Sequence, residues 1–169
     1  MRLFFALWPP ADAAHALADW AKEVQRASGG RASAEDSIHL TLAFLGEADP
    51  LKAAVAGRKA RGRRFELPID ACKYWRHNRI VWAGPRDMPA ALRDLVGALR
   101  EALKGGAFAL EARPFAAHIT LVRKASVAPS VIPELPHVSW PVGEFVLVRS
   151  RPQAGGSRYE ITDRFALAD

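Results

Sequence analysis

Apolar residues recur at two different spacings along this chain, one typical of strands and one typical of helices. Short aliphatic and aromatic runs, several of them alternating strictly, predict strands over residues 3–8, 37–45, 65–75, 79–83, 108–110, 117–123, 144–149 and 157–167. Spacings of three and four residues predict amphipathic helices over residues 11–27, 50–59 and 88–104. Strands and helices mixed in this irregular order indicate an α+β fold.

Two of the predicted strands carry the same short pattern of histidine, aliphatic residue, threonine and leucine. It occurs at residues 39–42 and again at residues 118–121. Successive side chains of a strand point to opposite faces, so the aliphatic residues enter a core while His39 and Thr41 share the other face. His118 and Thr120 repeat this arrangement.

Each copy of the pattern follows a predicted helix, which suggests two related halves. We therefore expect a single domain over residues 1–169, made of two lobes with pseudo-twofold symmetry around a central cleft and with helices on the outside. His39 and His118 would then face each other across the cleft.

Two facing imidazoles can divide acid–base work, because the unperturbed histidine pKa of about 6.5 allows both protonation states near neutral pH. In phosphodiester hydrolysis one imidazole takes a proton from water and the other protonates the leaving oxygen. The hydroxyls of Thr41 and Thr120 can bind phosphate oxygens without carrying charge. The pattern does not decide which histidine is the acid.

Other readings of the same residues have less support. No HExxH motif or acidic cluster accompanies either histidine as a metal site would require. No GxSxG elbow is present, and Cys72 has no histidine nearby in the sequence. A single His-x-Thr pattern would most simply be a structural feature of a strand, whereas two copies with the same alternation indicate a site.

The charge balance favours an anionic partner. Lysine and arginine number 24 against 18 acidic residues, for a formal net charge of +6. Residues 58–64 hold five of these cations, which either form a solvated connection or guide RNA phosphates by charge; the sequence leaves both open.

Cys72 is the only cysteine, which fits a reducing compartment. The apolar start ends at Pro9 and Pro10, and no stretch reaches transmembrane length, so we expect a cytoplasmic protein with no membrane partner.

The pattern and its surroundings resemble the RNA 2′,3′-cyclic phosphodiesterases, also called 2′-5′ RNA ligase-like proteins, of the 2H phosphoesterase superfamily. The resemblance covers nearly the whole chain and is carried by residues 2–7 with Pro9 and Pro10, 38–42 with 44–47, 113–115 with 118–121 and Arg123, and 149–150 with 158–160. One departure is Ala116-Ala117, where many relatives have a polar residue and proline before the second histidine. Alanine there removes no catalytic group.

The resemblance implies hydrolysis of an RNA terminal 2′,3′-cyclic phosphate to a 2′-phosphomonoester, without metal or other cofactor. It further implies that His39 is the proton donor, that His118 is the proton acceptor, and that Thr41, Thr120 and Arg123 bind phosphate. The expected partners are RNA ends with a 2′,3′-cyclic phosphate, tRNA fragments among them, and the expected state is a monomer. Reversible 2′-5′ RNA ligation on the same site and noncatalytic RNA binding are the alternatives.

Overall fold

Two four-stranded antiparallel sheets dominate the computed structural model, which describes residues 1–126 and 132–169. The first sheet has the strand order β10-β9-β1-β3, with bounds Gly156–Ala166, Glu144–Gln153, Arg2–Leu7 and Leu40–Glu47. The second has the order β2-β7-β6-β5, with bounds Arg31–Ala32, Ile119–Arg123, Ile80–Gly84 and Ala71–Trp75. A further small sheet pairs β4 (Phe65–Glu66) with β8 (Pro141–Val142). The predicted α+β fold with two antiparallel sheets is confirmed.

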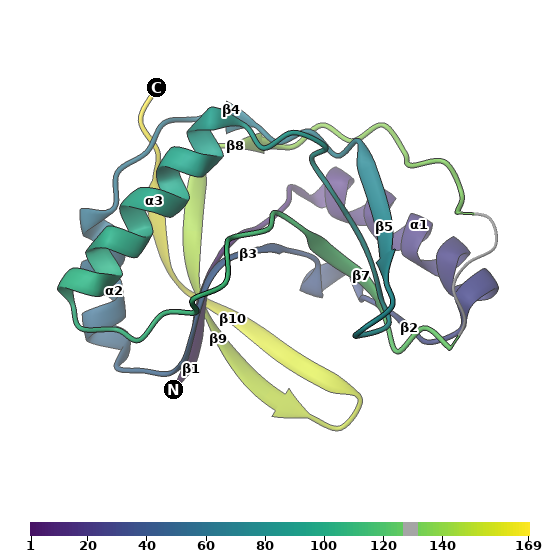
Figure 1. The fold of residues 1–169 in the computed structure, drawn as a ribbon, viewed down its shortest axis with the longest axis horizontal. Coiled ribbons are helices and arrows are strands. Elements are labelled where there is room, and N and C mark those ends of the chain that lie inside the picture. Colours follow the sequence, from purple (N-terminus) through teal and green to yellow (C-terminus); the bar gives the residue numbers. More distant parts are fainter. Residues whose placement is uncertain (127–131) are drawn as a thin grey trace.

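The helices cover the outer faces of the sheets. The described residues form α1 (Ala11–Ser28), α2 (Pro50–Lys59), α3 (Ala90–Gly105) and a short 3₁₀ helix, η1 (Glu35–Ser37). Figure 1 shows α2 and α3 together beside the first sheet and α1 behind the second. The chain therefore crosses over, because α1 follows a strand of the first sheet yet packs on the second. None of the described helices is both long enough and apolar enough to span a bilayer.

Strand β1 lies at the centre of the packing because both of its faces are covered. Leu3, Phe5 and Leu7 enter the main core, and Phe4 and Ala6 belong to a second apolar cluster on the opposite face. A strand buried on both faces reads as a continuous apolar run rather than an alternating one. That run is what the sequence shows at residues 3–7.

Helix α2 begins as the sequence predicts. The carboxylate of Asp49 accepts a hydrogen bond of 2.9 Å from the amide of Leu51, and Pro50 occupies the first helical position. An N-cap carboxylate satisfies one of the free amides of the first turn, and proline has no amide to satisfy.

The predicted strand at residues 108–110 is wrong, because those residues form no strand. The amide of Phe108 donates to the carbonyl of Leu103, and the amide of Ala107 donates to the carbonyl of Lys104. These bonds close the last turn of α3, with Ala107 at a positive φ of 64°. Residues 108–110 therefore follow the capped end of α3 and join no sheet.

Other strands also differ from prediction. The expected strand at residues 65–75 is divided into β4 and β5, since Pro68 has no amide to continue a ladder. The expected strand at residues 37–45 begins only at Leu40, because residues 35–37 form η1. Strands β2 and β8 were not predicted; β8 begins at Pro141, the last residue of the expected loop at 128–141, part of which falls outside the described residues.

Candidate active site

The two histidines stand at matching places, each directly before the first residue of its strand. His39 precedes β3 and His118 precedes β7. The aliphatic residues of both patterns are fully buried, including Ile38 and Ile119, whereas both histidines and both threonines remain partly exposed. The predicted alternation between core and open face is therefore confirmed in both halves.

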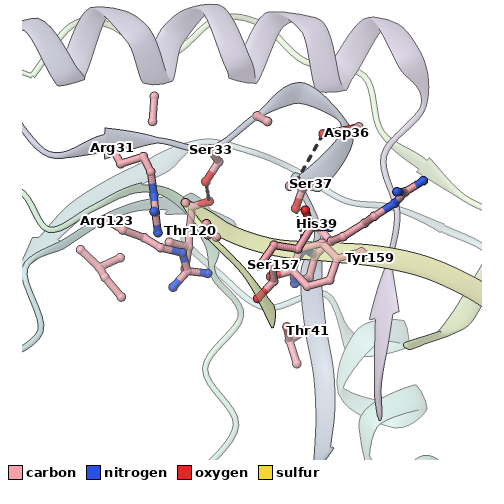
Figure 2. Close-up of a pocket in the computed structure, with 18 of the residues that line it drawn as sticks. Arg31, Ser33, Asp36, Ser37, His39, Thr41, Thr120, Arg123, Ser157 and Tyr159 are labelled. Carbon is pink, nitrogen blue, oxygen red and sulfur yellow. Dashed lines mark hydrogen bonds between the residues drawn. The ribbon is translucent and has the colours of Figure 1, made fainter. Parts of the chain in front are cut away.

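One pocket of about 1090 Å³ brings the five predicted site residues together. It is lined by His39, Thr41, His118, Thr120 and Arg123. Figure 2 shows Thr120 and Arg123 on one side of the pocket and His39 and Thr41 on the other. The arrangement in which the histidines would lie on opposite outer faces is thus ruled out.

Both imidazoles are oriented by the same local hydrogen bond. Nδ1 of His39 donates to the carbonyl of Ser37 at 2.7 Å, and Nδ1 of His118 donates to the carbonyl of Ala116 at 2.8 Å. A carbonyl oxygen can only accept, so the proton must reside on Nδ1. This leaves Nε2 of each ring as the nitrogen that can exchange a proton with a ligand.

Three aromatic rings surround the imidazole of His39. Trp8 stacks on it with centroids 5.0 Å apart and planes inclined by 5°, and Phe4 and Tyr159 lie at 5.0 and 5.1 Å. This enclosure removes water from the ring and lowers the pKa of His39 to about 4. The charges of Arg123 and His118 act in the same direction, while the hydrogen bond to Ser37 opposes them.

The lowered pKa of His39 predicts how stability depends on pH. The unfolded chain, with a histidine pKa near 6.5, binds more protons than the folded chain between about pH 6.5 and pH 4. The free energy of unfolding should therefore fall as the pH is lowered through that window. His39→Asn should make this dependence shallower, as measured by urea unfolding at pH 7, 6, 5 and 4.5. Equal slopes for parent and variant would contradict the enclosure of a neutral imidazole.

The second imidazole also lies against aromatic rings. The centroid of Trp75 lies 4.8 Å from that of His118, and the centroid of Trp82 lies 6.2 Å away. Both tryptophans belong to the β5–β6 hairpin. They form the wall that supports His118.

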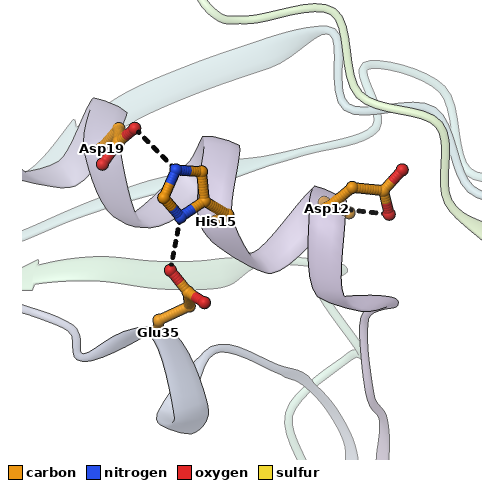
Figure 3. Close-up of polar contacts among 5 residues, drawn as sticks. Asp12, His15, Asp19 and Glu35 are labelled. Carbon is orange, nitrogen blue, oxygen red and sulfur yellow. Dashed lines mark hydrogen bonds and ion pairs between the residues drawn. The ribbon is translucent and has the colours of Figure 1, made fainter.

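The carbonyl that orients His39 belongs to η1, and a polar contact ties η1 to helix α1. Nδ1 of His15 donates to Glu35 at 2.8 Å, and Nε2 lies 3.4 Å from Asp19 (Figure 3). The hydrogen bond to Glu35, followed by the charges of Asp19 and Glu35, raises the pKa of His15. His15 lies on the exposed side of α1, and its contact with Glu35 joins residues 20 positions apart, so no local pattern indicates it.

The pocket is strongly cationic. Besides Arg123 it is lined by Arg31 and Arg158, against a single acidic residue, Asp36. Arg31 and Arg158 were not predicted as site residues; Arg31 belongs to a strand of two residues, which is too short to give a periodic signal. The basic run at residues 58–64 does not line this pocket, so its guidance of RNA stays a prediction. Within the described ranges, no group of three or more histidine, cysteine, aspartate or glutamate side chains could hold a metal ion.

Comparison with known proteins agrees with this geometry. The sequence profile of the 2′-5′ RNA ligase superfamily matches residues 9–154. The chain belongs to this superfamily. Among its relatives is the RNA 2′,3′-cyclic phosphodiesterase of Escherichia coli K12, 39% identical, with 98% of this chain and 96% of the relative covered. The enzyme of the same name from Thermus thermophilus is 33% identical, with 99% of this chain and 90% of the relative covered.

Solved structures of superfamily members share the whole fold. The crystal structure of Escherichia coli LigT complexed with 3′-AMP has a TM-score of 0.90 and 36% identity, covering 99% of this chain and 98% of that one. The structure of TT0787 from Thermus thermophilus has a TM-score of 0.83 and 29% identity, with the same coverage. These solved structures therefore share the arrangement of the two sheets found in this chain.

Proposed function

We propose that this chain is an RNA 2′,3′-cyclic phosphodiesterase, which hydrolyses the terminal cyclic phosphate of RNA to a 2′-phosphomonoester. One observation carries the proposal. Two imidazoles from equivalent strands line one cationic pocket, each with its proton fixed on Nδ1 and its Nε2 available. The names of the relatives support the same activity.

In the proposed reaction, water attacks phosphorus on the side opposite the 3′ oxygen. Nε2 of His118 accepts the proton of the attacking water as the new P–O bond forms. The bond from phosphorus to the 3′ oxygen breaks, and protonated Nε2 of His39 donates its proton to that oxygen. The products are a 2′-phosphomonoester and a free 3′ hydroxyl. Each proton transfer of this kind contributes roughly 100 to 10,000-fold to the rate.

The donor role requires that His39 be protonated when substrate is bound. In the free protein its pKa of about 4 leaves the imidazole neutral near pH 7. A phosphodiester anion beside Nε2 favours the charged imidazolium and raises this pKa in the complex. Because the surroundings disfavour the charged form, the imidazolium gives up its proton readily once the 3′ oxygen develops charge.

The remaining predicted site residues bind the phosphate in this proposal. The hydroxyls of Thr41 and Thr120 donate to the two non-bridging oxygens, one from each sheet, and hold phosphorus in line between the imidazoles. Arg123 supplies positive charge close to the developing charge on these oxygens.

The setting of the reaction is part of the proposal. The chain acts as one two-lobed domain over residues 1–169, as a monomer in the cytoplasm, on RNA fragments that include those of tRNA. It needs no metal or other cofactor, since two imidazoles supply both proton transfers.

A second candidate function is reversible 2′-5′ RNA ligation, which the name of the matched superfamily favours. It would use the same two histidines, because forming a 2′-5′ phosphodiester from a cyclic phosphate replaces water with a 5′ hydroxyl. Product analysis separates the two reactions.

The assay that tests the proposed function combines EDTA with RNA oligonucleotides ending in a 2′,3′-cyclic phosphate. We expect undiminished turnover in EDTA and a 2′-phosphomonoester as the product, identified by chromatography against 2′- and 3′-phosphate standards. A 3′-phosphate product would mean that the other P–O bond breaks. RNA binding without turnover of any cyclic phosphate would favour the noncatalytic alternative.

A further inference from the structure

Arg31 lines the pocket but has no role in the proposed proton transfers or in binding the cyclic phosphate. It opens β2, which pairs antiparallel with β7 so that Arg31 lies opposite Arg123. Both arginines line the pocket, and Figure 2 shows them beside Thr120. Partners on adjacent antiparallel strands point to the same face, with Cβ atoms about 4.5–5.5 Å apart. Two cations thus enter the same end of the pocket from neighbouring strands.

The backbone of β2 is held closely against β7. Gly30 has a φ of 84°, and a Cβ on it would lie 2.4 Å from the carbonyl oxygen of Arg123. Only glycine fits there without moving one strand. On the other side of Arg31, the amide of Ser33 donates to the carbonyl of Leu121 at 2.8 Å, and its hydroxyl donates to the carbonyl of Thr120 at 2.9 Å. The position of Arg31 is therefore fixed by its neighbours on both sides.

Within residues 1–126 and 132–169, neither arginine of this pair has a carboxylate partner, because no ion pair there involves Arg31 or Arg123. Like charges directly opposite on two strands destabilise a sheet. Such an arrangement is relieved when an anion binds between or beside the two guanidinium groups.

The two arginines are placed differently with respect to the reaction. The charge of Arg123 acts on the imidazole of His39, whose pKa it helps to lower. Arg31 comes from the edge strand of the second sheet, on the side of β7 away from β6. An RNA end that places its cyclic phosphate at the histidines carries its other phosphates only on the 5′ side of the terminal nucleoside.

We propose that Arg31 forms a second phosphate subsite, which binds the phosphate on the 5′ oxygen of the terminal nucleoside. This inference rests on the proposed function, because it assumes that the cyclic phosphate occupies the histidine site. The subsite makes Arg31 a specificity residue. It favours RNA ends, which carry that phosphate, over mononucleoside 2′,3′-cyclic phosphates, which lack it.

The test compares two substrates that differ by this one phosphate: uridine 2′,3′-cyclic phosphate and its 5′-phosphorylated form. The parent protein should turn over the phosphorylated substrate with the higher kcat/KM. Arg31→Ala should reduce that preference about tenfold, the size of a lost charge-assisted hydrogen bond at an exposed site. Arg31→Lys should retain part of the preference, since it keeps the charge but not the guanidinium fork.

Arg93→Ala is the matched control, because Arg93 is an exposed arginine on α3 outside the pocket and its loss changes the net charge equally. It should leave the preference at the parent value. Equal losses on both substrates in Arg31→Ala, or a parent without preference, would overturn the second subsite while leaving the proposed function intact. Failure of the parent to hydrolyse an RNA oligonucleotide that ends in a 2′,3′-cyclic phosphate, assayed alongside, would instead overturn the proposed function, and the subsite with it.

Discussion

Replacing either His39 or His118 by alanine should lower turnover of an RNA 2′,3′-cyclic phosphate by at least about 100-fold. Each substitution removes the only Nε2 on its side of the pocket that can take or give the proton. A positioned acid or base is worth roughly 100 to 10,000-fold. The measurement is kcat under saturating substrate in EDTA, with circular dichroism to verify that each variant folds. Turnover within a few-fold of the parent for either variant would contradict the two-histidine mechanism.

The same variants can separate the acid from the base. In a cyclic phosphate whose 3′ bridging oxygen is replaced by sulfur, the leaving thiolate needs no proton. His39→Ala should therefore lose much less activity on this substrate than on the oxygen substrate, whereas His118→Ala should lose as much on both. The reverse pattern would assign the donor role to His118.

The elements that the sequence predicted well are those whose signal is local. Alternation at residues 38–42 and 119–121 places the aliphatic side chains in the core, and the partial exposure of His39 and His118 follows from it. The cap at Asp49 and Pro50 depends on residues adjacent in sequence. The site histidines could be predicted for the same reason, since the pattern that carries them occurs twice.

What the sequence could not predict depends on contacts between distant segments. The rings around His39 belong to Phe4 on β1, to Trp8, which follows β1, and to Tyr159 on β10. Nothing in the local sequence around Tyr159 indicates a contact with His39. Strand β2 has only two residues, which is too few for a periodic signal. The position of Arg31 in the pocket follows from the pairing of β2 with β7, which the sequence does not indicate. The strand predicted at residues 108–110 is wrong for a local reason. The amide of Phe108 donates to a carbonyl of α3 and is therefore not free to pair with another strand.

Replacing the hydroxyls of the two threonines should have the next largest effect. Thr41→Val and Thr120→Val keep the shape of the side chain but remove the donor that each sheet offers to phosphate. Loss of one such donor costs about 100- to 1,000-fold in a buried site, and we expect about 10- to 100-fold here because both threonines are partly exposed. The measurement is kcat/KM on the RNA substrate, with KM determined separately.

Thr41→Ser and Thr120→Ser separate the hydroxyl from the methyl group. If the hydroxyl binds phosphate, serine should keep activity within a few-fold of the parent while valine does not. If serine and valine are equally impaired, the threonines act by packing, and the phosphate must be held by other donors in the pocket. Because the two threonines occupy equivalent positions on β3 and β7, the two sites should respond alike. A large loss at one site and none at the other would show that the two halves do not share the phosphate, despite their matching patterns.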